Sequence, residues 1–436
     1  MSIRTLLMPV VSHWLLSRQR LLRKRARAEQ RRMAQGLPHE LLYFHQIDDP
    51  YSHLTLQALA PLMERYALQL RPLLVSPPDD SAAPDRERLV AYSRLDAQLL
   101  AKERDLHYRD PGRQPGENAI TTTGLALMQL IASGRLVQDG PAVSARLWSD
   151  ASLDHSKVTA DDIAELQRTQ QHGDRLRHRL GHYLGATFFY AGEWYWGIDR
   201  LHHLEERLQS LGAWRGQEVS GQLLFPPEAD LARDQPLATA PELDFFFSLR
   251  SPYSAIVAPR VFALARRTGA RLRLRFVLPM VMRGLAVPRH KRMYISHDAA
   301  REAHSRGIPF GKLNDPVGRP AERGLALIPW AERLGRGQDF VLAFMHAVWA
   351  EGVDAGSDAG LQRIVEASGL PWSQARLALH DESWRVQAEA NRQALLALGL
   401  WGVPSFRVGS MAVWGQDRLG RVHKALQEAH RQELFR

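Results

Sequence analysis

The chain has 436 residues and no cysteine. Dithiol exchange, thiolate side chains, disulfides and sulfur-ligated metals are therefore excluded, and any thiol chemistry must use a thiol supplied by a ligand. The chain also lacks a phosphate-binding glycine loop, a metal-binding pair of histidines around a glutamate, and a nucleophile elbow. Its 18 histidines show no ligand spacing, so we expect no metal.

Outside the N-terminal segment the chain has little net positive charge. The net charge is +10, and residues 1–39 hold nine basic residues against one acidic residue, which accounts for +8. The remaining body is close to neutral, and this argues against a basic nucleic-acid-binding surface. We therefore expect no nucleic-acid partner.

The N-terminal segment, residues 1–39, is basic and amphipathic. Its apolar part is too short to span a bilayer, and it lacks the small-residue cleavage site of a secretory signal, so we interpret the protein as cytoplasmic. Two interpretations of the segment stay open. Residues 1–32 provide peripheral membrane contact through apolar burial and basic charge, or a helix docks on the body with a solvated arginine face.

The chain carries one segment twice. Residues 40–52 read ELLYFHQIDDPYS and residues 242–254 read ELDFFFSLRSPYS. The run GLAL recurs at Gly124 and Gly324, and a Trp-Gly-x-Asp-Arg-Leu motif recurs downstream in both copies. A repeat of this length indicates a duplicated domain, and the chain is long enough for two cores.

The duplication predicts four parts. They are the segment 1–39, a first domain at 40–213, a linker rich in proline, alanine and acidic residues at 214–240, and a second domain at 241–436. Each copy is expected to run strand, helix, parallel strand, helical region, two short strands and terminal helix, which is an α/β fold. The expected strands are 41–44, 68–75, 187–191 and 193–196 in the first copy, and 243–247, 271–278, 405–408 and 411–414 in the second.

The second copy resembles a known family. The runs FFFSLRSPYSAI, KRMY, GLWGVPSFRVG and VWGQDRL are similar to the DsbA-like thioredoxin superfamily, specifically its cysteine-free branch of 2-hydroxychromene-2-carboxylate isomerases and kappa-class glutathione transferases. The resemblance implies two tandem thioredoxin-like domains, each with an inserted helical subdomain. It also implies bound glutathione as the thiol and a small-molecule electrophile as substrate.

The resemblance gives roles to residues around the Ser-Pro turn. Ser251 matches the serine that hydrogen-bonds the glutathione sulfur, and Val403 and Pro404 match the residues before and at a cis-proline whose backbone pairs with the glutathione peptide. A hydroxyl donor and a helix N-terminus both lower a thiol pKa, and Ser251 offers both. The alternative is structural, because serine is a favoured N-cap and proline a favoured first helical residue.

Other site residues are also implied by the resemblance. Gln416 and Asp417 match the helix-start pair that holds the γ-glutamyl end, and Lys291 matches a basic residue of the site. As alternatives, Asp417 caps the last helix and Lys291 is a solvated surface lysine. Three residues are candidates for lining the acceptor side, with packing or solvation as the alternative: Arg250, Tyr253 and Trp401.

The first copy differs from the second at the residues that carry these roles. Three replacements are expected: Ser251 by Asp49, Pro404 by Thr187, and Lys291 by Leu89. We expect Asp49 to be ionised near neutral pH, and a carboxylate beside a thiolate raises the thiol pKa. The first copy is therefore predicted to be inactive and to serve as a covalently attached partner in an internal pseudo-dimer.

Two functions remain open at this point. One is a glutathione-dependent isomerase or transferase acting through Ser251. The other is a non-catalytic thioredoxin-like binding or scaffold protein that the basic tail localises. Intact Ser251, Pro404 and Asp417 favour the first, and the divergent first copy favours the second.

Overall fold

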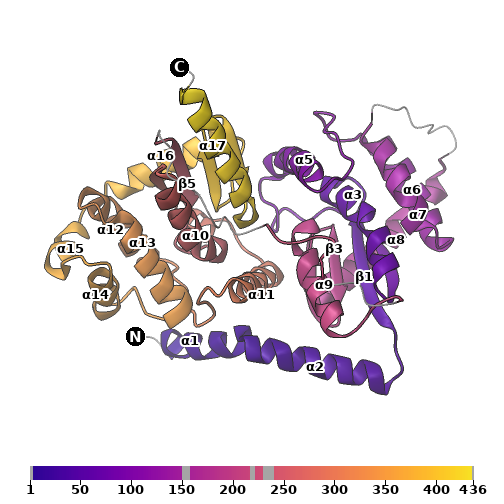
Figure 1. Ribbon diagram of the computed structural model, residues 1–436, viewed down its shortest axis with the longest axis horizontal. Coiled ribbons are helices and arrows are strands. Elements are labelled where there is room, and N and C mark those ends of the chain that lie inside the picture. The colour runs from indigo at the N-terminus through magenta and orange to yellow at the C-terminus, as the bar shows by residue number, and fades with distance from the viewer. Residues whose placement is uncertain (1–2, 150–157, 217–220, 229–239, 435–436) are drawn as a thin grey trace. The chain divides into compact units, whose positions relative to one another are not determined.

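The computed structural model describes residues 3–149, 158–216, 221–228 and 240–434, and these form two compact units (Figure 1). The first unit comprises Arg23–Pro227 and Pro288–Tyr294. The second comprises Met1–Leu22, Glu228–Val287 and Ile295–Arg436. The expected N-terminal segment is thus divided between the units, and the expected linker at 214–240 lies partly outside the described residues.

The first unit is built on a four-stranded sheet with the order β2-β1-β3-β4. Strand β1 (His39–Gln46) pairs in parallel with β2 (Leu68–Val75) and antiparallel with β3 (Thr187–Tyr190), which pairs with β4 (Glu193–Trp196). All but one residue of β1 is buried. The apolar run at residues 41–44 in the middle of β1 suits a central strand that is covered on both faces.

Helices surround this sheet, and four of them, α5 to α8, lie in the chain between β2 and β3 as a helical insertion. Helix α8 begins with a capping box, in which the side chains of Thr159 and Asp162 each accept a hydrogen bond from the other residue's backbone N–H. The helices are α2 (Arg18–Ala34), α3 (Pro50–Gln57), α4 (Leu59–Arg65), α5 (Arg86–Glu103), α6 (Glu117–Ala132), α7 (Leu136–Leu147), α8 (Ala160–Leu180), η1 (Ile198–Arg200) and α9 (Leu201–Ser210).

The second unit contains a sheet of the same order, β6-β5-β7-β8. Strand β5 (Glu242–Phe247) pairs in parallel with β6 (Arg271–Phe276) and antiparallel with β7 (Ser405–Val408), and β7 pairs with β8 (Met411–Trp414). The predicted strands are confirmed, with ends that shift by at most two residues. The α/β class is therefore correct.

The second unit has more helical material before its hairpin than the first. Three helices, α14 to α16, lie between the π-helical turn η3 and β7, whereas the described residues between α7 and β3 contain only α8. The helices are α1 (Ile3–Leu16), α10 (Pro252–Thr268), η2 (Met280–Arg283), α11 (Arg289–Ser305), α12 (Arg319–Arg333), α13 (Gly337–His346), η3 (Ala347–Glu351), α14 (Asp358–Ala367), α15 (Trp372–Ala378), α16 (Trp384–Ala397), η4 (Gln416–Arg418) and α17 (Leu419–Leu434).

Strand register corrects one expected correspondence. Thr187 pairs with the last residue of β4, and Ser405 pairs with the last residue of β8. These two residues are therefore counterparts. The expectation that Thr187 replaces Pro404 was wrong by one residue, and Ala186 is the true counterpart of Pro404. The sequence motifs around this position are too dissimilar to fix the alignment, whereas the hydrogen-bonded ladder fixes it.

Both units hold their first helix to the helical insertion by the same hydrogen bond. The Tyr51 hydroxyl donates to Asp96 over 2.7 Å, and the Tyr253 hydroxyl donates to Asp298 over 2.8 Å. Both aspartates are almost fully buried. A buried carboxylate needs such a partner, so this pair is a shared element of the fold.

Candidate active site at the start of helix α10

Ser251 is the N-cap of α10. Its backbone is extended, its Oγ accepts a hydrogen bond from the Ser254 N–H over 3.1 Å, and Pro252 follows at the first helical position. The Ser251 hydroxyl lies 3.5 Å from the Val403 carbonyl oxygen, at the upper limit for a hydrogen bond. The Ser-Pro pair thus does start the helix, as the structural alternative expected. In this cap the Ser251 hydroxyl makes only a long hydrogen bond as donor.

The Val403–Pro404 peptide bond is cis, as the resemblance implied. The Pro404 carbonyl accepts a hydrogen bond from the Gly415 N–H over 2.9 Å. A Cβ atom at Gly402 would overlap the Trp414 indole, so only glycine lets the loop pass this ring. The loop therefore brings Val403 and Pro404 to the start of α10 beside Ser251.

Gln416 lies at the start of η4, directly before α17, and is buried. Its amide nitrogen donates to Glu302 over 3.0 Å and also to Asp417, and its amide oxygen accepts from Arg260 over 3.2 Å. The side chain of Gln416 is thus held by protein groups. Asp417 is half-buried beside it.

Glu228 is a polar residue of this region that sequence reasoning missed. Its carboxylate accepts a hydrogen bond from the Gly420 N–H in the first turn of α17 and lies 3.9 Å from Arg260. Burial raises the pKa of Glu228 to about 7, with Asp417 contributing in the same direction. Glu228 belongs to the segment expected to be a linker, where nothing in the local sequence marks a contact with α17.

The three residues expected to line the acceptor side have structural contacts. The Arg250 guanidinium forms a two-point ion pair with Asp315, at 2.7 and 2.8 Å. The Tyr253 hydroxyl is used in the hydrogen bond to the insertion described above. Trp401 is buried, and its ring lies 5.4 Å from that of Trp414 in an edge-on arrangement. Each of the three side chains therefore has a structural role within the second unit.

Lys291 is grouped with the first unit. Its ammonium donates to the Ala82 carbonyl over 2.6 Å and lies 5.6 Å from the centre of the Tyr183 ring. Burial lowers the pKa of Lys291 to about 8. The lysine is therefore not a solvated surface residue, and its described contacts are not with Ser251, Val403 or Pro404.

In the first unit, Asp49 occupies the position of Ser251 and caps α3. Its carboxylate accepts from the Ser52 N–H over 3.0 Å and from the Ser52 hydroxyl over 2.8 Å. Burial raises the pKa of Asp49 to about 7, with the neighbouring Asp48 contributing in the same direction. The expectation that Asp49 is ionised near neutral pH assumed an ordinary carboxyl pKa, and burial moves the pKa of Asp49 well above that value. A single sequence gives no measure of this burial.

The residue before the cis-proline also differs between the units. Gly185 is the counterpart of Val403, and a Cβ atom at Gly185 would overlap the side chain of Gln46. The next residue, Ala186, donates its N–H to the Ser52 hydroxyl over 2.9 Å, a bond that a proline cannot make. The first unit has thus filled this region with side-chain and backbone contacts of its own.

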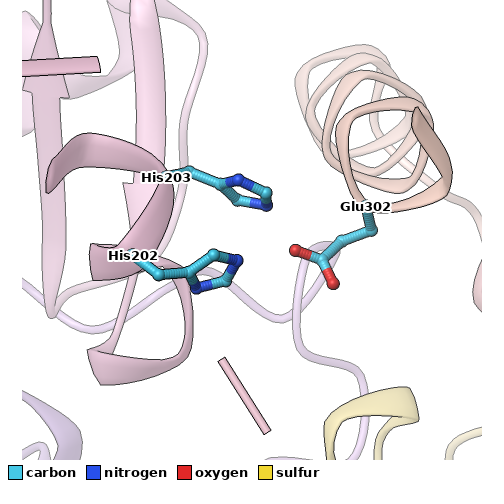
Figure 2. Close-up of side chains that lie close together, drawn as sticks. All are labelled: His202, His203 and Glu302. Carbon is cyan, nitrogen blue, oxygen red and sulfur yellow. The ribbon is translucent and has the colours of Figure 1, made fainter. Parts of the chain in front are cut away.

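The first turns of the terminal helices differ as well. Where α17 has Gly420 and Arg421, α9 has His202 and His203, whose buried rings lie side by side with centroids 3.9 Å apart (Figure 2). Figure 2 also labels Glu302 of α11, which belongs to the second unit and accepts the Gln416 hydrogen bond there. The helix that follows Gln416 and Asp417 in the second unit therefore begins with different side chains from its counterpart in the first.

Comparison with known proteins identifies the second half of the chain. The family model described as DSBA-like thioredoxin domain matches residues 242–427, which contain all four strands of the second unit. Among curated proteins, the 2-hydroxychromene-2-carboxylate isomerase of Sphingobium xenophagum is 26% identical over 184 residues, which are 41% of this chain and 93% of that protein.

Solved structures give matches over a similar share of the chain. A structure of 2-hydroxychromene-2-carboxylate isomerase is 23% identical, with a TM-score of 0.39, and the match covers 44% of this chain and 98% of that one. The cytosolic disulfide reductase DsbM of Pseudomonas aeruginosa is 20% identical, with a TM-score of 0.34, over 45% of this chain and 100% of that one. The family match places a DsbA-like thioredoxin domain at residues 242–427.

Proposed function

We propose that the second unit is a glutathione-dependent isomerase or transferase acting on a small electrophile, with Ser251 stabilising the glutathione thiolate. The observation that carries this proposal is the position of the Ser251 hydroxyl at the start of α10, beside Val403 and the cis-proline. The similarity to a 2-hydroxychromene-2-carboxylate isomerase, in a chain without cysteine, supports the reaction class.

The residues at this position suit an anionic sulfur. The Ser251 oxygen already accepts a hydrogen bond from the backbone, and its proton has only the long contact with the Val403 carbonyl. The hydroxyl can therefore turn its proton toward a thiolate. The first turn of α10 adds the positive end of a helix of 17 residues. Both effects favour the thiolate over the thiol.

The other candidate residues differ in how readily they could contact glutathione. The backbone of Val403 is the group that would pair with the glutathione peptide. Gln416 could hold the γ-glutamyl end only by exchanging its bonds to Glu302 and Arg260, whereas Asp417 offers a carboxylate for the γ-glutamyl amine. Lys291 contacts the first unit, so we assign it no role beside the sulfur.

Bound glutathione would supply a thiol nucleophile for an unsaturated carbon, and rotation followed by elimination gives isomerisation while retention of the adduct gives transfer. The task of Ser251 is to lower the thiol pKa by donating a hydrogen bond from its hydroxyl to the sulfur. The loop at Gly402, Val403 and Pro404 places the Val403 carbonyl next to that hydroxyl. These features suit both outcomes, and the acceptor decides between them.

A second candidate function is a non-catalytic binding module. It is favoured by one observation, namely that Gln416 and the first turn of α17 are already occupied by Glu302, Arg260 and Glu228. In that case the Ser-Pro turn serves as a helix cap alone. The two functions differ in whether glutathione binds and whether Ser251 matters for it.

We also infer that the two units arose by tandem duplication and that the first has lost the site. Their common sheet order and the matching Tyr51–Asp96 and Tyr253–Asp298 hydrogen bonds support this inference. Asp49 and Ala186 then record the loss, because the Asp49 carboxyl is engaged with Ser52 and alanine cannot take the place of the proline.

The test is calorimetric titration of glutathione into the full chain and into Ser251→Ala and Asp49→Ala variants. We expect Ser251→Ala to weaken binding about tenfold or more, since a hydrogen bond to a charged group contributes about 1.5 to 3 kcal/mol. Asp49→Ala should leave the affinity unchanged. Thermal melting of each variant checks that it is folded, and ultraviolet absorbance of the bound thiolate reports the thiol pKa.

Failure to bind glutathione in the unmodified chain would overturn the proposal and favour the binding module. Equal losses in the two variants would overturn the division of roles between the units. If Ser251→Ala still binds glutathione and the thiol pKa is unchanged, Ser251 does not stabilise the thiolate, although the glutathione site exists.

A further inference from the structure

One face of helix α1 is docked on the second unit. Pro9, Ser12 and Leu16 are buried, at a spacing of three and four residues that places them on the same side of the helix. The Ser12 hydroxyl accepts the Leu313 N–H over 2.8 Å. Gly352, with a φ of +72°, has no side chain to displace Pro9. The docked interpretation of this segment is thus correct for one face of α1.

The opposite face of α1 is apolar and open to solvent. Five large side chains have exposed fractions between 49% and 65%: Leu6, Leu7, Val10, Val11 and Trp14. The N-terminal 37 residues hold eight of the fourteen exposed large apolar side chains in the described part of the chain. A contiguous stripe of this kind marks an interaction surface, whereas single exposed apolar residues do not.

The helix that follows α1 is strongly basic. Helix α2 has no buried residue along its 17 positions. Three of its cationic side chains, Lys24, Arg27 and Arg31, are exposed at a spacing of three and four residues, so they share a face. Arg25 is instead paired with Glu193, and the Arg20 guanidinium lies 3.1 Å from the centre of the Trp14 ring. Along the chain, the apolar residues of α1 are thus followed by the cations of α2.

We propose that the exposed face of α1, with the cations of α2, docks on an anionic lipid surface. The apolar side chains would enter the boundary between headgroups and acyl chains, and the lysine and arginines would pair with lipid phosphates. Charge complementarity selects this occupant, because a second copy of the chain would bring the same cations together. No helix in the described residues has the length and apolar character needed to cross a membrane, so the contact is peripheral.

The experiment measures binding of the full chain to vesicles of phosphatidylcholine alone and of phosphatidylcholine and phosphatidylglycerol in equal parts. Flotation should recover the chain with the anionic vesicles and much less with the neutral ones. The variant Lys24→Gln, Arg27→Gln, Arg31→Gln should lose about fivefold per residue, or roughly a hundredfold in all, on anionic vesicles alone. Added salt should weaken binding in the same direction.

A matched pair of variants tests the apolar stripe. Leu7→Glu with Val10→Glu should abolish binding. Leu377→Glu with Val386→Glu should not, because Leu377 and Val386 are even more exposed but lie elsewhere, in α15 and α16. All four side chains are exposed, so both variants should fold, and circular dichroism checks this.

Three results would overturn the proposal. One is the absence of binding to anionic vesicles by the unmodified chain, and another is an equal loss in the two apolar variants. The third is a dimer by light scattering that only Leu7→Glu with Val10→Glu dissolves, which would assign the stripe to self-association. None of these results depends on glutathione binding.

Discussion

The two units have the same sheet and differ at the start of the first helix. In the second unit the capping oxygen belongs to Ser251, whose proton has one long contact, whereas in the first unit the Asp49 carboxylate takes both the N–H and the hydroxyl of Ser52. Both side chains cap the helix, and both helices form. The comparison separates the part of this turn that the fold requires, an oxygen acceptor, from the part that chemistry would require, a hydroxyl donor.

The hairpin tryptophans give a second comparison. Trp196 ends β4 and packs edge-on against Tyr51, with ring centroids 5.6 Å apart. Trp414 ends β8 and packs against Trp401 and over Gly402. The same strand position thus supports the first helix in one unit and the cis-proline loop in the other. Substitutions at this loop should therefore affect the second unit selectively.

The largest effect is expected for Gly402→Ala. The new methyl group would overlap the Trp414 indole, and overpacking of this kind should lower the free energy of unfolding by about 3 kcal/mol. Denaturant titration measures the change, and Gly116→Ala, at a glycine with open space around it, should cost less than about 1 kcal/mol. In a Trp414→Ala background the cost of Gly402→Ala should largely disappear, and a cost that persists there would contradict this packing account.

A smaller effect is expected for Asp49→Asn, and it depends on pH. The folded pKa of Asp49 is about 7, above the ordinary value of about 3.9, so the folded state binds more protons between these values. The contribution of Asp49 to stability is therefore complete below about pH 4 and is lost as the pH rises through 7. Asparagine keeps the cap without the charge and should raise the free energy of unfolding at about pH 8 by about 1 to 2 kcal/mol.

Denaturation midpoints at about pH 5 and pH 8 measure this difference. The gain from Asp49→Asn should be much smaller at the lower pH, where the aspartate is already mostly protonated. Ser251→Asn, at the equivalent cap of the second unit, removes no titrating group and should change stability equally at both values. A gain for Asp49→Asn that does not depend on pH would show that the buried charge is not its cause.

Much of the fold could be predicted from the sequence because it depends on local pattern. Apolar runs such as Leu243 to Phe247 mark buried strands, and Ser251 before Pro252 marks a helix start. The repeat fixed the order of the elements in both halves. The register around Ala186 could not be predicted, because a shift of one residue between dissimilar loops is decided by strand pairing.

The candidate site was predictable only where residues are adjacent in the chain or belong to a motif. Ser251 and the cis-proline were found in this way, and they do lie together. Glu228 contacts the first turn of α17 and Arg260 contacts Gln416, both across long stretches of chain, and no spacing in the sequence reports such contacts. The raised pKa values of Asp49 and Glu228 likewise could not be predicted from the sequence, because they follow from burial in the folded chain.

The smallest effect is expected for Glu228→Gln. This substitution tests the difference between the terminal helices, α9 in the first unit and α17 in the second. Glu228 occupies the positive end of α17 in the second unit, where a ligand carboxylate would gain from the same N–H groups. Removing its charge should tighten glutathione binding about twofold to fivefold at about pH 8. Because the pKa of Glu228 is about 7, the gain should shrink at about pH 6, where the side chain is mostly protonated.

Calorimetry at the two pH values measures this gain, with Glu242→Gln as the control because Glu242 pairs with arginines of the sheet. This prediction rests on the proposed function, and the two can fail separately. If no variant binds glutathione, the proposed function is wrong. If the unmodified chain and Glu228→Gln bind with equal affinity at both pH values, glutathione binds without meeting Glu228, and the glutamate acts only as a remote cap of α17.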